Sequence, residues 1–592
     1  MEETLARLKK MAEEARAARE AKATAPAAVK LSLADILAAQ QKAAEAKKAP
    51  MVEVPTVASI KKAYNQINLV GSVAWNERQQ LGINYAQQGK SFCLIGAAGT
   101  GKTTTLKGCI QTKLANELIP MLRSGTKQLL RETPGIALVS YTRRAVRQIA
   151  RQLPPDLSRH AMTIHKLLEF EPVFYEMVQP DGSIKRTRRF EPMRHSGNPL
   201  PAELTTIFVD ESSMVASDLF EMLRDAAPRN CQFIFLGDMH QLPPVYGDSI
   251  LAAKLQELPV VELTEVYRQA LDSPIISLAT DIKNGIPIPL TVKRKMESPD
   301  GKSSVTINPW PKQLHEEDAM DMLAHTIKNL VNSGNFNEEE DVVLMPHNVG
   351  LGTLELNLHF ANALGLQRKA VVHHVIAGFM HWYLAEGDRV LVDKQDCVIR
   401  KVERNPKYSG KIPLEASDTL DRWGTYQDDK EHHHLEETNE DIDEMLQRMA
   451  DAEVEDKQNQ ASHVITIESL DTGNTWRVGE VGIFAGMVFS YALTVHKSQG
   501  SEWRRVFVFL HTKHHAMCSR ELVYTAVTRA RETLIIICEP DRRGSDGTLT
   551  KAAKNPRIKG NTLAEKLEWL RLRSLERMAA GKKGEDDELF GK

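Results

Sequence analysis

Cysteine is scarce in this chain, and its placement argues against two classes of protein. The 592 residues contain six cysteines and no Cys-x-x-Cys pair, so the sequence indicates neither a zinc site nor a disulfide framework. Three adjacent histidines at 432–434 stand among acidic residues, a setting more typical of a solvated loop than of a metal site. We therefore expect a reducing compartment and no structural metal.

Long hydrophobic runs and an excess of one charge are lacking as well. No apolar segment reaches the roughly 20 residues that cross a bilayer, and the N-terminus has no apolar signal-peptide region. We expect a soluble intracellular protein, cytoplasmic or nucleoid-associated, with no membrane partner. The formal net charge is -2, so any contact with nucleic acid depends on local basic clusters such as Arg143, Arg144 and Arg147.

The most informative motif is the segment 96–103, which reads GAAGTGKT and matches the phosphate-binding loop G-x-x-x-x-G-K-[ST]. An apolar run at 92–95 predicts a buried strand before it, and a helix is expected from residue 104 onward. Such a loop presents backbone N–H groups, a lysine for the β and γ phosphates and a hydroxyl for Mg²⁺. The predicted nucleotide contacts are Gly96, Gly99, Gly101, Lys102, Thr103 and Thr104.

Two further strands supply the polar groups that hydrolysis of a bound nucleotide needs. The segment 207–211, IFVDE, ends in Asp210, which we expect to hold Mg²⁺ with Thr103, and Glu211, which we expect to polarise water. Adjacent carboxylates after a strand are common by chance, so this match has weight only together with Lys102. The strand at 233–236 opens into GDMHQ, which would place Gln241 beside the γ phosphate to position water.

These residues resemble the superfamily 1 helicases, in particular the RecD-like and Dda-like group that moves 5′ to 3′ on single-stranded DNA. The resemblance follows the chain in order and is specific because eight motifs occur in the right sequence. Besides the phosphate loop and the carboxylates, the matching segments are WNERQQ at 75–80 (Q motif), 140–145 and 163–167 (motifs Ia and Ib), LTEVYRQ at 263–269 (motif IV), YALTVHKSQGSE at 491–502 (motif V) and YTAVTRAR at 524–531 (motif VI).

The resemblance implies roles for residues outside the phosphate loop. Gln79 would read adenine, Tyr267 would stack on the base, Arg268 would reach the γ phosphate, and Arg529 would be the arginine finger. Gly500 and Glu502 of motif V complete the nucleotide contacts. The implied DNA contacts are Thr142, Arg144, Thr163, His165, Thr494, His496 and Lys497. Surface ion pairs are the ordinary alternative for the two arginines, and packed core positions for the two histidines.

The length and the 42% hydrophobic content imply several domains. The predicted class is α/β: two RecA-like parallel-sheet motor domains with an inserted β-hairpin and an inserted SH3-like β subdomain. Residues 1–54 are expected to form an Ala/Lys/Glu-rich tail, and residues 556–592 a C-terminal helix and acidic tail. The first motor domain is expected at 55–273, with the hairpin at about 170–200. The second is expected at 274–555, with the insert at about 385–485 and its acidic segment at 405–460.

The hairpin is predicted from FYEMVQ and SIKRTRRF on either side of a Pro-Asp-Gly turn at 180–182. In the family this place holds the strand-separating pin, so Phe174, Tyr175 and Phe190 are candidates to meet the terminal base pair. Packing of these rings onto the first motor domain is the alternative.

The sequence therefore predicts an ATP-dependent DNA helicase, using ATP and Mg²⁺ and moving 5′ to 3′ on single-stranded DNA in replication, recombination or repair. The expected partners are single-stranded DNA, tailed duplex DNA and a single-strand-binding or recombination protein, with the motor a monomer. Two alternatives stay open at this point: a translocase that displaces proteins from DNA, and a nucleotide-switched subunit of a recombination complex.

Overall fold

The structure is a computed structural model that describes residues 57–116, 118–120, 135–158, 160–178, 184–244, 249–266, 272–310, 316–338, 340–378, 380–392, 395–408, 460–470, 473–560 and 562–579. The chain divides into two units, Met1–Ile60 and Lys61–Lys592. Of the first unit only residues 57–60, in helix α3 (Val57–Asn65), are described. The predicted N-terminal tail, most of the acidic segment and the acidic C-terminal tail lie outside the described residues.

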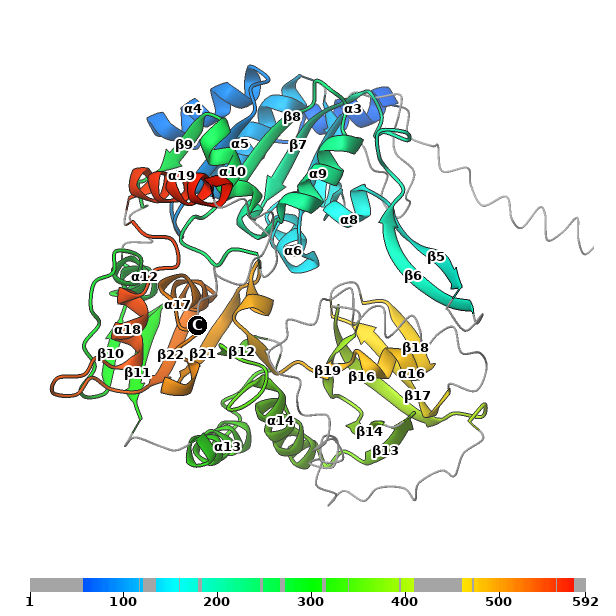
Figure 1. The fold of residues 1–592 in the computed structure, drawn as a ribbon, viewed down its shortest axis with the longest axis vertical. Helices are drawn as coiled ribbons and strands as arrows, with labels where there is room; N and C mark the ends of the chain where they lie inside the picture. Colours follow the sequence, from blue (N-terminus) through cyan, green and yellow to red (C-terminus); the bar gives the residue numbers. More distant parts are fainter. Residues whose placement is uncertain are drawn as a thin grey trace, which may run out of the picture. The chain divides into compact units, whose positions relative to one another are not determined.

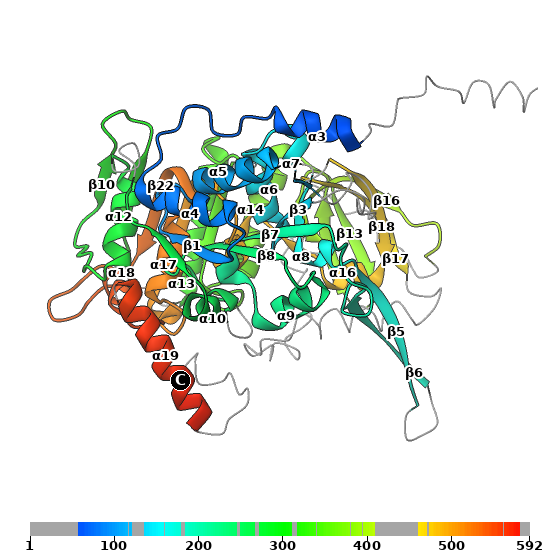
Figure 2. The same cartoon turned by 90° about the horizontal axis from the view of Figure 1, so that it is seen from above.

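The first sheet of the larger unit is parallel throughout and runs in the order β2-β3-β7-β8-β1-β9, with β4 paired to β3. Its helices cover both faces, with α4 and α5 on one side and α9 and α10 on the other (Figures 1 and 2). The bounds are β1 (Phe92–Gly96), β2 (Ile119–Pro120), β3 (Gly135–Ser140), β4 (Ala161–Thr163), β7 (Leu204–Asp210), β8 (Gln232–Gly237), β9 (Val260–Leu263), α4 (Glu77–Gln87), α5 (Lys102–Ala115), α6 (Arg143–Arg151), α7 (Pro155–Ser158), α8 (Ile164–Leu167), α9 (Ser217–Ala226) and α10 (Ile250–Glu257).

Apolar runs at 92–95, 136–140, 207–209 and 233–236 predict four strands in this sheet, which are confirmed as parts of β1, β3, β7 and β8. Every residue of β1 and β3 is buried, as expected for parallel strands covered on both faces. The sequence pattern did not predict β2, β4 and β9, which are only two to four residues long. Short strands of this kind carry too few residues for a periodic pattern.

The second sheet runs in the order β10-β11-β22-β21-β12-β20 and is parallel except for the pairing of β10 with β11. Alternate residues of β12 face different helices: Val342 and Leu344 share a core with α12, α17 and α18, whereas Val343 and Met345 share one with α13 and α14. The bounds are β10 (Arg294–Glu297), β11 (Ser304–Pro309), β12 (Asp341–Met345), β20 (Ala492–Thr494), β21 (Trp503–Leu510), β22 (Ala530–Cys538), α12 (Pro274–Lys283), α13 (Glu316–Asn332), α14 (Thr353–Arg368), α17 (Arg520–Val527), α18 (Thr548–Lys554) and α19 (Leu563–Ala579).

An antiparallel insert interrupts the second sheet between β12 and β20. It consists of the pair β13–β14 and a five-stranded sheet in the order β18-β17-β16-β15-β19. The bounds are β13 (Val372–Ala377), β14 (Met380–Ala385), β15 (Arg389–Val392), β16 (Gln395–Arg404), β17 (Gln460–Ser469), β18 (Thr475–Glu480), α16 (Val481–Ala485) and β19 (Val488–Phe489). The alternating segment TWRVGEVGI predicts one strand over 475–483, but the strand ends at Glu480 because α16 begins at Val481.

A second insertion leaves the first sheet after α8 as the hairpin of β5 (Phe170–Val178) and β6 (Ile184–Pro192). The strands pair from Phe170 opposite Pro192 to Val178 opposite Ile184. Figures 1 and 2 show the hairpin extending away from the sheet that carries it. The Pro-Asp-Gly turn predicted at 180–182 lies outside the described residues.

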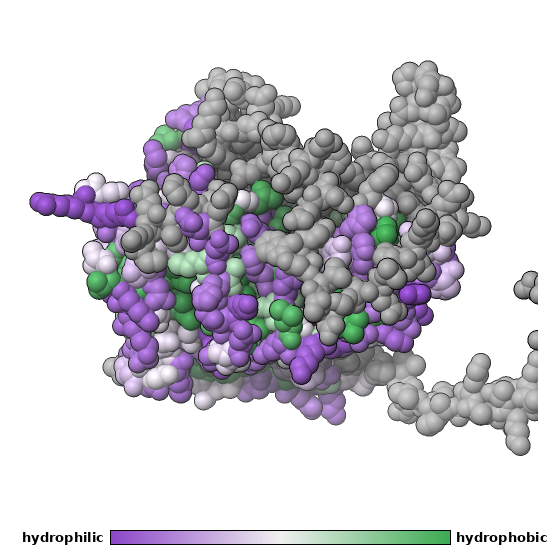
Figure 3. Space-filling view, turned by 90° about the horizontal axis from the view of Figure 1, so that it is seen from below, coloured by the Kyte–Doolittle hydropathy of each residue, from purple (hydrophilic) through white to green (hydrophobic). Residues whose placement is uncertain are grey.

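The described surface is mixed in character. On the face shown in Figure 3, hydrophilic side chains cover much of the coloured area and apolar ones form small separate groups. Within the described part of the chain, no helix has the length and apolar content needed to cross a bilayer.

Candidate nucleotide site at the junction of two parallel sheets

The phosphate loop connects β1 to α5, and its backbone conformation depends on glycine. Gly99 and Gly101 have φ of 78° and 83°, which disfavours any residue with a Cβ. A Cβ on Gly96 would stand 2.3 Å from Thr100 Oγ1. Helix α5 begins at Lys102, so the loop leaves N–H groups of a helix N-terminus available to an anion.

Two carboxylates lie near this loop, because the charge of Lys102 acts on both. Asp210 ends β7, and Glu211 follows with a left-handed φ of 51°. Burial, with a further contribution from the charge of Glu211, raises the pKa of Asp210 to about 7. Burial also raises the pKa of Glu211, although the positive charges of Arg529 and Lys102 oppose this rise. Two carboxylates and two cationic side chains therefore share one cluster.

The charge cluster has the composition that Mg²⁺ and a triphosphate require. Thr103 and Asp210 offer a hydroxyl and a carboxylate, the hard oxygen ligands that Mg²⁺ favours. Lys102 Nζ donates to the carbonyls of Gly96 at 2.6 Å and Ala97 at 3.1 Å, which holds its charge at the loop. When bound, Mg²⁺ would neutralise phosphate charge.

Two buried amide side chains also fit a nucleotide. The backbone N–H of Asn76 donates to Gln79 Oε1 at 3.2 Å, so the Gln79 amide has a fixed orientation. Among the residues that the structure describes, its Nε2 is buried without a hydrogen-bond partner, as is Oε1 of Gln241. Buried groups of this kind cost stability unless a ligand or water satisfies them. Both residues were predicted to face the nucleotide, and the unmatched atoms support that role.

Arg529 reaches the site from the second sheet. It is 4% exposed and follows helix α17, where Nε donates to the carbonyl of Thr525 at 3.0 Å and Nη1 to that of Ser501 at 3.1 Å. Its charge lowers the pKa of Glu211 in the first sheet. The predicted arginine finger and the predicted water-activating carboxylate therefore lie close enough to interact.

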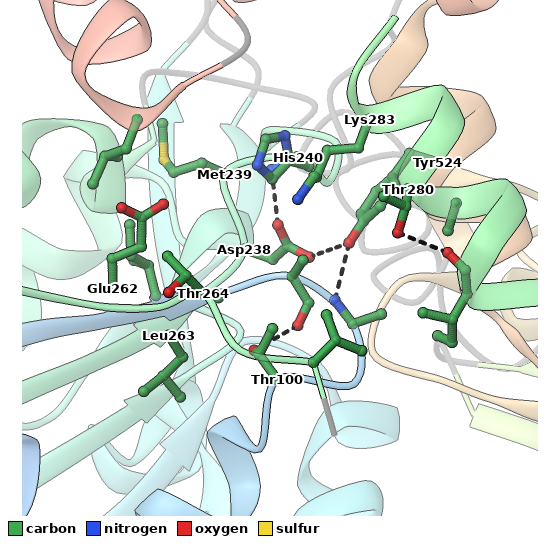
Figure 4. Close-up of a pocket in the computed structure, with 18 of the residues that line it drawn as sticks. Thr100, Asp238, Met239, His240, Glu262, Leu263, Thr264, Thr280, Lys283 and Tyr524 are labelled. Atoms are coloured by element: carbon green, nitrogen blue, oxygen red, sulfur yellow. Dashed lines mark hydrogen bonds between the residues drawn. The ribbon is translucent and has the colours of Figure 1, made fainter. Parts of the chain in front are cut away.

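Tyr524 links the two sheets directly at the phosphate loop. Its hydroxyl donates to Asp238 Oδ2 at 2.8 Å and accepts from the backbone N–H of Ala98 at 3.0 Å, as drawn in Figure 4. Burial would raise the pKa of Asp238, but Lys102 and the bonds from His240 and Tyr524 hold it below its usual value. Asp238 is therefore the acceptor, and the phenol keeps its proton.

A cavity of about 230 Å³ lies beside this linkage. Figure 4 shows the loop residue Thr100, the end of β9 at Leu263 and Thr264, and helix α12 at Thr280 and Lys283 around it. Lys566 of α19 completes the lining. The cavity thus joins the phosphate loop to both sheets and to the C-terminal helix.

Some predicted nucleotide contacts have other placements. Tyr267 and Arg268 lie outside the described residues. Gly500, with φ of 72°, packs against α6, where an added Cβ would stand 2.7 Å from Ala145 Cβ. Glu502 accepts a hydrogen bond from Gln148 Nε2 at 2.8 Å and its charge raises the pKa of Glu211. Motif V therefore contacts the first sheet, while the nucleotide roles of its residues stay predictions.

The three predicted DNA-contacting threonines have structural partners in the chain. Thr142 caps α6 by accepting from Ala145 N at 3.1 Å, and Thr163 caps α8 by accepting from Lys166 N at 3.2 Å. Thr494 accepts from Lys497 N at 3.3 Å. The hydroxyl oxygen of each threonine thus accepts a backbone N–H. A contact with DNA would use the same hydroxyl group.

The guanidinium of Arg144 makes its observed contacts with other residues of this chain. Its guanidinium forms a two-pronged ion pair with Asp396 of the insert and donates to the Lys497 carbonyl at 2.8 Å. A buried pair of this type is a structural contact between α6 and the insert. The role predicted for Arg144 on DNA would require this pair to open.

The remaining predicted DNA residues divide between buried and exposed positions. His165 lies against Phe170 with ring centroids 4.9 Å apart, and burial lowers the pKa of His496 to about 4, so His496 is neutral near pH 7. Lys497 is exposed. In the hairpin, Phe190 is 46% exposed, whereas the side chains of the other two aromatic candidates, Phe174 and Tyr175, lie outside the described atoms.

His240, next to Tyr524, gives the site a pH-dependent stability. Burial lowers the pKa of His240 to about 3. The negative charge of Asp238 opposes this decrease, and the positive charges of Lys566, Lys283 and Arg520 add to it. Because the unfolded chain binds this proton near pH 6.5 and the native chain does not, stability is retained above pH 6.5 and falls below it, by at most about 1.4 kcal/mol per pH unit. His240→Gln should reduce this slope in urea unfolding between pH 6.5 and 5. An unchanged slope would contradict the assignment.

Sequence reasoning missed several residues of the site. Asp238 lies in the segment GDMHQ, from which only Gln241 was predicted to act. Tyr524 lies in motif VI, from which only Arg529 was predicted to act. Lys566 was part of a predicted C-terminal helix with no assigned role. The available signal was a lysine at 566 among leucines at 563, 567 and 570, since helical spacing places all four on one face.

The geometry defines a nucleotide-binding α/β protein with a site shared by two parallel sheets. Two family models match the same parts of the chain: an AAA domain over residues 79–247 and a UvrD-like helicase C-terminal domain over residues 489–537. The first contains the phosphate loop and both carboxylates, and the second contains Tyr524 and Arg529. The prediction of an α/β fold with parallel sheets is thus confirmed.

Known proteins resemble the chain over a longer span. The ATP-dependent RecD2 DNA helicase of Deinococcus radiodurans is 27% identical over 444 residues, covering 74% of this chain and 46% of that protein. The RecBCD enzyme subunit RecD of Mycolicibacterium smegmatis is 23% identical over 509 residues, covering 80% of this chain and 72% of that protein. Less than half of the Deinococcus protein is therefore represented here.

A solved structure of the Pif1 helicase from Bacteroides with ADP-AlF3 and single-stranded DNA has 16% identity and a TM-score of 0.40, covering 86% of this chain and 98% of that one. The family models and the sequence relatives confirm the resemblance to the RecD-like superfamily 1 helicases. The Deinococcus relative is an ATP-dependent DNA helicase, the enzyme class predicted for this chain.

Proposed function

We propose that this protein is an ATP-dependent DNA helicase that translocates on single-stranded DNA. One observation carries the proposal: the groups suited to ATP hydrolysis come from both sheets. Lys102, Glu211 and Gln241 belong to the first, and Arg529 to the second, with its charge acting on Glu211. A site shared in this way links the chemistry to the relative position of two sheets, which is what a stepping motor needs.

In the proposed cycle, Lys102 binds the β and γ phosphates and Gln241 orients the attacking water. Glu211 accepts the proton of that water, and Arg529 stabilises charge that develops on the transferring group. Thr103 and Asp210 hold Mg²⁺. Gln79 and Tyr267 bind the base, and Arg268 supports the γ phosphate, as the family resemblance implies.

The expected domain division is part of the proposal. Residues 55–273 and 274–555 would form the two motor domains, with residues 385–485 as an SH3-like subdomain in the second. The parallel sheets on either side of residue 274 and the antiparallel insert support this division. Thr142, Thr163, His165, Thr494, His496 and Lys497 would face the DNA strand from both motor domains.

The decisive experiment compares two partial duplexes that carry single-stranded tails of opposite polarity. We expect single-stranded DNA to stimulate ATP hydrolysis and the 5′-tailed duplex alone to be unwound. Hydrolysis without unwinding of either substrate would favour the translocase that displaces proteins. Hydrolysis stimulated only by a partner protein would favour the nucleotide-switched subunit.

We propose the β5–β6 hairpin as the strand-separating pin. Its nine-residue strands extend from the first sheet, and the exposed ring of Phe190 offers a stacking surface to any base. Base-pair steps are held by roughly 1 to 2 kcal/mol of stacking. A translocating motor can convert movement into separation only if the duplex meets a rigid obstacle.

Shortening the hairpin should separate unwinding from hydrolysis. With residues 178–185 replaced by a short Gly-Ser turn, we expect unwinding to fall at least about tenfold, because the duplex can then pass the shortened obstacle. DNA-stimulated ATP hydrolysis should stay within about twofold, since the phosphate site is untouched. Gel-based strand displacement and a coupled ATPase assay measure the two rates.

The matched control replaces residues 299–302, the turn between β10 and β11, with the same Gly-Ser segment. This control should retain both activities. Full unwinding by the shortened-hairpin variant would refute the pin, and equal loss of both activities would identify the hairpin as a structural element.

A further inference from the structure

The C-terminal helix α19 returns to the first sheet and packs on it. Its first turn is fixed by Thr562 and Glu565, since Glu565 N donates to Thr562 Oγ1 at 3.3 Å and Thr562 N to Glu565 Oε2 at 3.4 Å. Leu563, Leu567 and Leu570 then pack against the core of that sheet. In Figure 1 the helix crosses beside α10, which it contacts.

A lysine stands on this apolar face. Lys566 is 1% exposed, and burial lowers its pKa. Its Nζ donates to the carbonyl of Met239 at 3.2 Å and to Nδ1 of His240 at 2.9 Å. A buried ammonium is costly unless its bonds are made. Both of its bonds go to residues 237–241, which we call the Asp238 loop.

The Asp238 loop carries Gln241, the predicted water-positioning residue. Besides Lys566, its partners come from the second sheet: Tyr524 donates to Asp238, and the neighbouring Leu242 N donates to Thr525 Oγ1 at 3.0 Å. Gln499 Nε2 donates to the Leu242 carbonyl at 2.8 Å. The loop is therefore held from two directions, and α19 supplies one of them.

A second contact connects α19 to the helix that precedes Arg529. Glu521 of α17 is 1% exposed, and its carboxylate accepts the backbone N–H of Arg557 at 2.9 Å and of Ile558 at 3.4 Å. These residues lead into α19. Helix α17 thus reaches the Asp238 loop by two routes, directly through Tyr524 and indirectly through Glu521, α19 and Lys566.

We propose that Lys566 is a positioning residue for ATP hydrolysis, and that α19 is a working part of the ATPase site. Lys566 fixes the Asp238 loop so that Gln241 faces the reacting phosphate. The proposal rests on the proposed function of the site. The physical reason is that Gln241 follows directly after the two residues that Lys566 binds, so a loop released on one side would no longer hold the glutamine in place.

The test uses Lys566→Met, which keeps the apolar stem against the leucines and removes the charge, and Lys566→Arg, which restores a cationic donor. We expect Lys566→Met to lower kcat of the DNA-stimulated ATPase about tenfold, because small displacements at a reacting centre have effects of this size or larger. The affinities for ATP and for single-stranded DNA should stay within about twofold, since the hydrogen bonds of Lys566 go to Met239 and His240 of the protein. Lys566→Arg should recover most of kcat.

A second readout reports the loop itself. In hydrogen exchange of the intact protein without nucleotide, the peptide spanning 233–244 should exchange faster in Lys566→Met than in wild type. The control, Arg571→Met, removes an exposed charge of the same helix that pairs with Glu568. We expect it to match wild type in kcat, exchange and melting temperature.

The outcomes separate this inference from the proposed function. A wild-type protein with no DNA-stimulated ATPase refutes the proposed function, and the exchange of the 233–244 peptide still tests the hold of Lys566 on the loop. An active wild type with kcat unchanged in Lys566→Met overturns the inference alone. Unchanged loop exchange, or equal losses of kcat and ATP affinity, also overturns it.

Discussion

Lys102→Ala is expected to lower ATP turnover about a thousandfold, the size of effect seen when a preorganised donor to a reacting anion is removed. Lys102 is the only cation of the phosphate loop. Its charge lies near both carboxylates, because it lowers the pKa of Asp210 and opposes the rise in that of Glu211. Alanine would leave the phosphates without a positive charge from the loop itself. A coupled ATPase assay at saturating DNA measures the loss.

Lys107→Ala is the matched control, because Lys107 belongs to the same helix and lies outside the loop. It should keep turnover within about twofold, as expected for a substitution away from the reacting groups. Thermal unfolding should show both variants folded. Turnover of Lys102→Ala within tenfold of wild type would remove the basis for the phosphate site.

Arg529→Ala is expected to reduce turnover by about a thousandfold while changing nucleotide affinity only slightly. An arginine supplied to a phosphoryl-transfer site stabilises charge that appears in the transition state, and such groups contribute factors of about 10³ or more. The pKa effect of Arg529 on Glu211 places the charge near the reacting groups. Single-turnover hydrolysis and equilibrium binding of a fluorescent ATP analogue measure the two quantities.

Two further variants define the role of Arg529. Arg529→Lys keeps the charge but loses the planar fork, and we expect intermediate turnover. Arg531→Ala removes an exposed arginine two residues later and should resemble wild type. A parallel loss of affinity and turnover in Arg529→Ala would identify a ground-state ligand, and a lower melting temperature with normal turnover would identify a structural residue.

The sequence by itself determined the local parts of this protein. The phosphate loop, the carboxylates after β7 and the longer strands of the first parallel sheet followed from short segments, because glycine conformations, apolar runs and helix starts are set by neighbours in the chain. The hairpin position followed from a turn signal between two extended segments. The motif order also indicated the resemblance to RecD-like helicases that the sequence relatives confirm.

Tertiary structure alone decided which side chains meet. The pairing of Arg144 with Asp396, the bridge from Tyr524 to Asp238 and the bonds of Lys566 join residues 252, 286 and more than 300 positions apart. A local pattern shows that an arginine or lysine is present but not which partner takes its charge. That choice depends on how sheets and helices pack, since packing determines which polar groups are buried together and must satisfy one another.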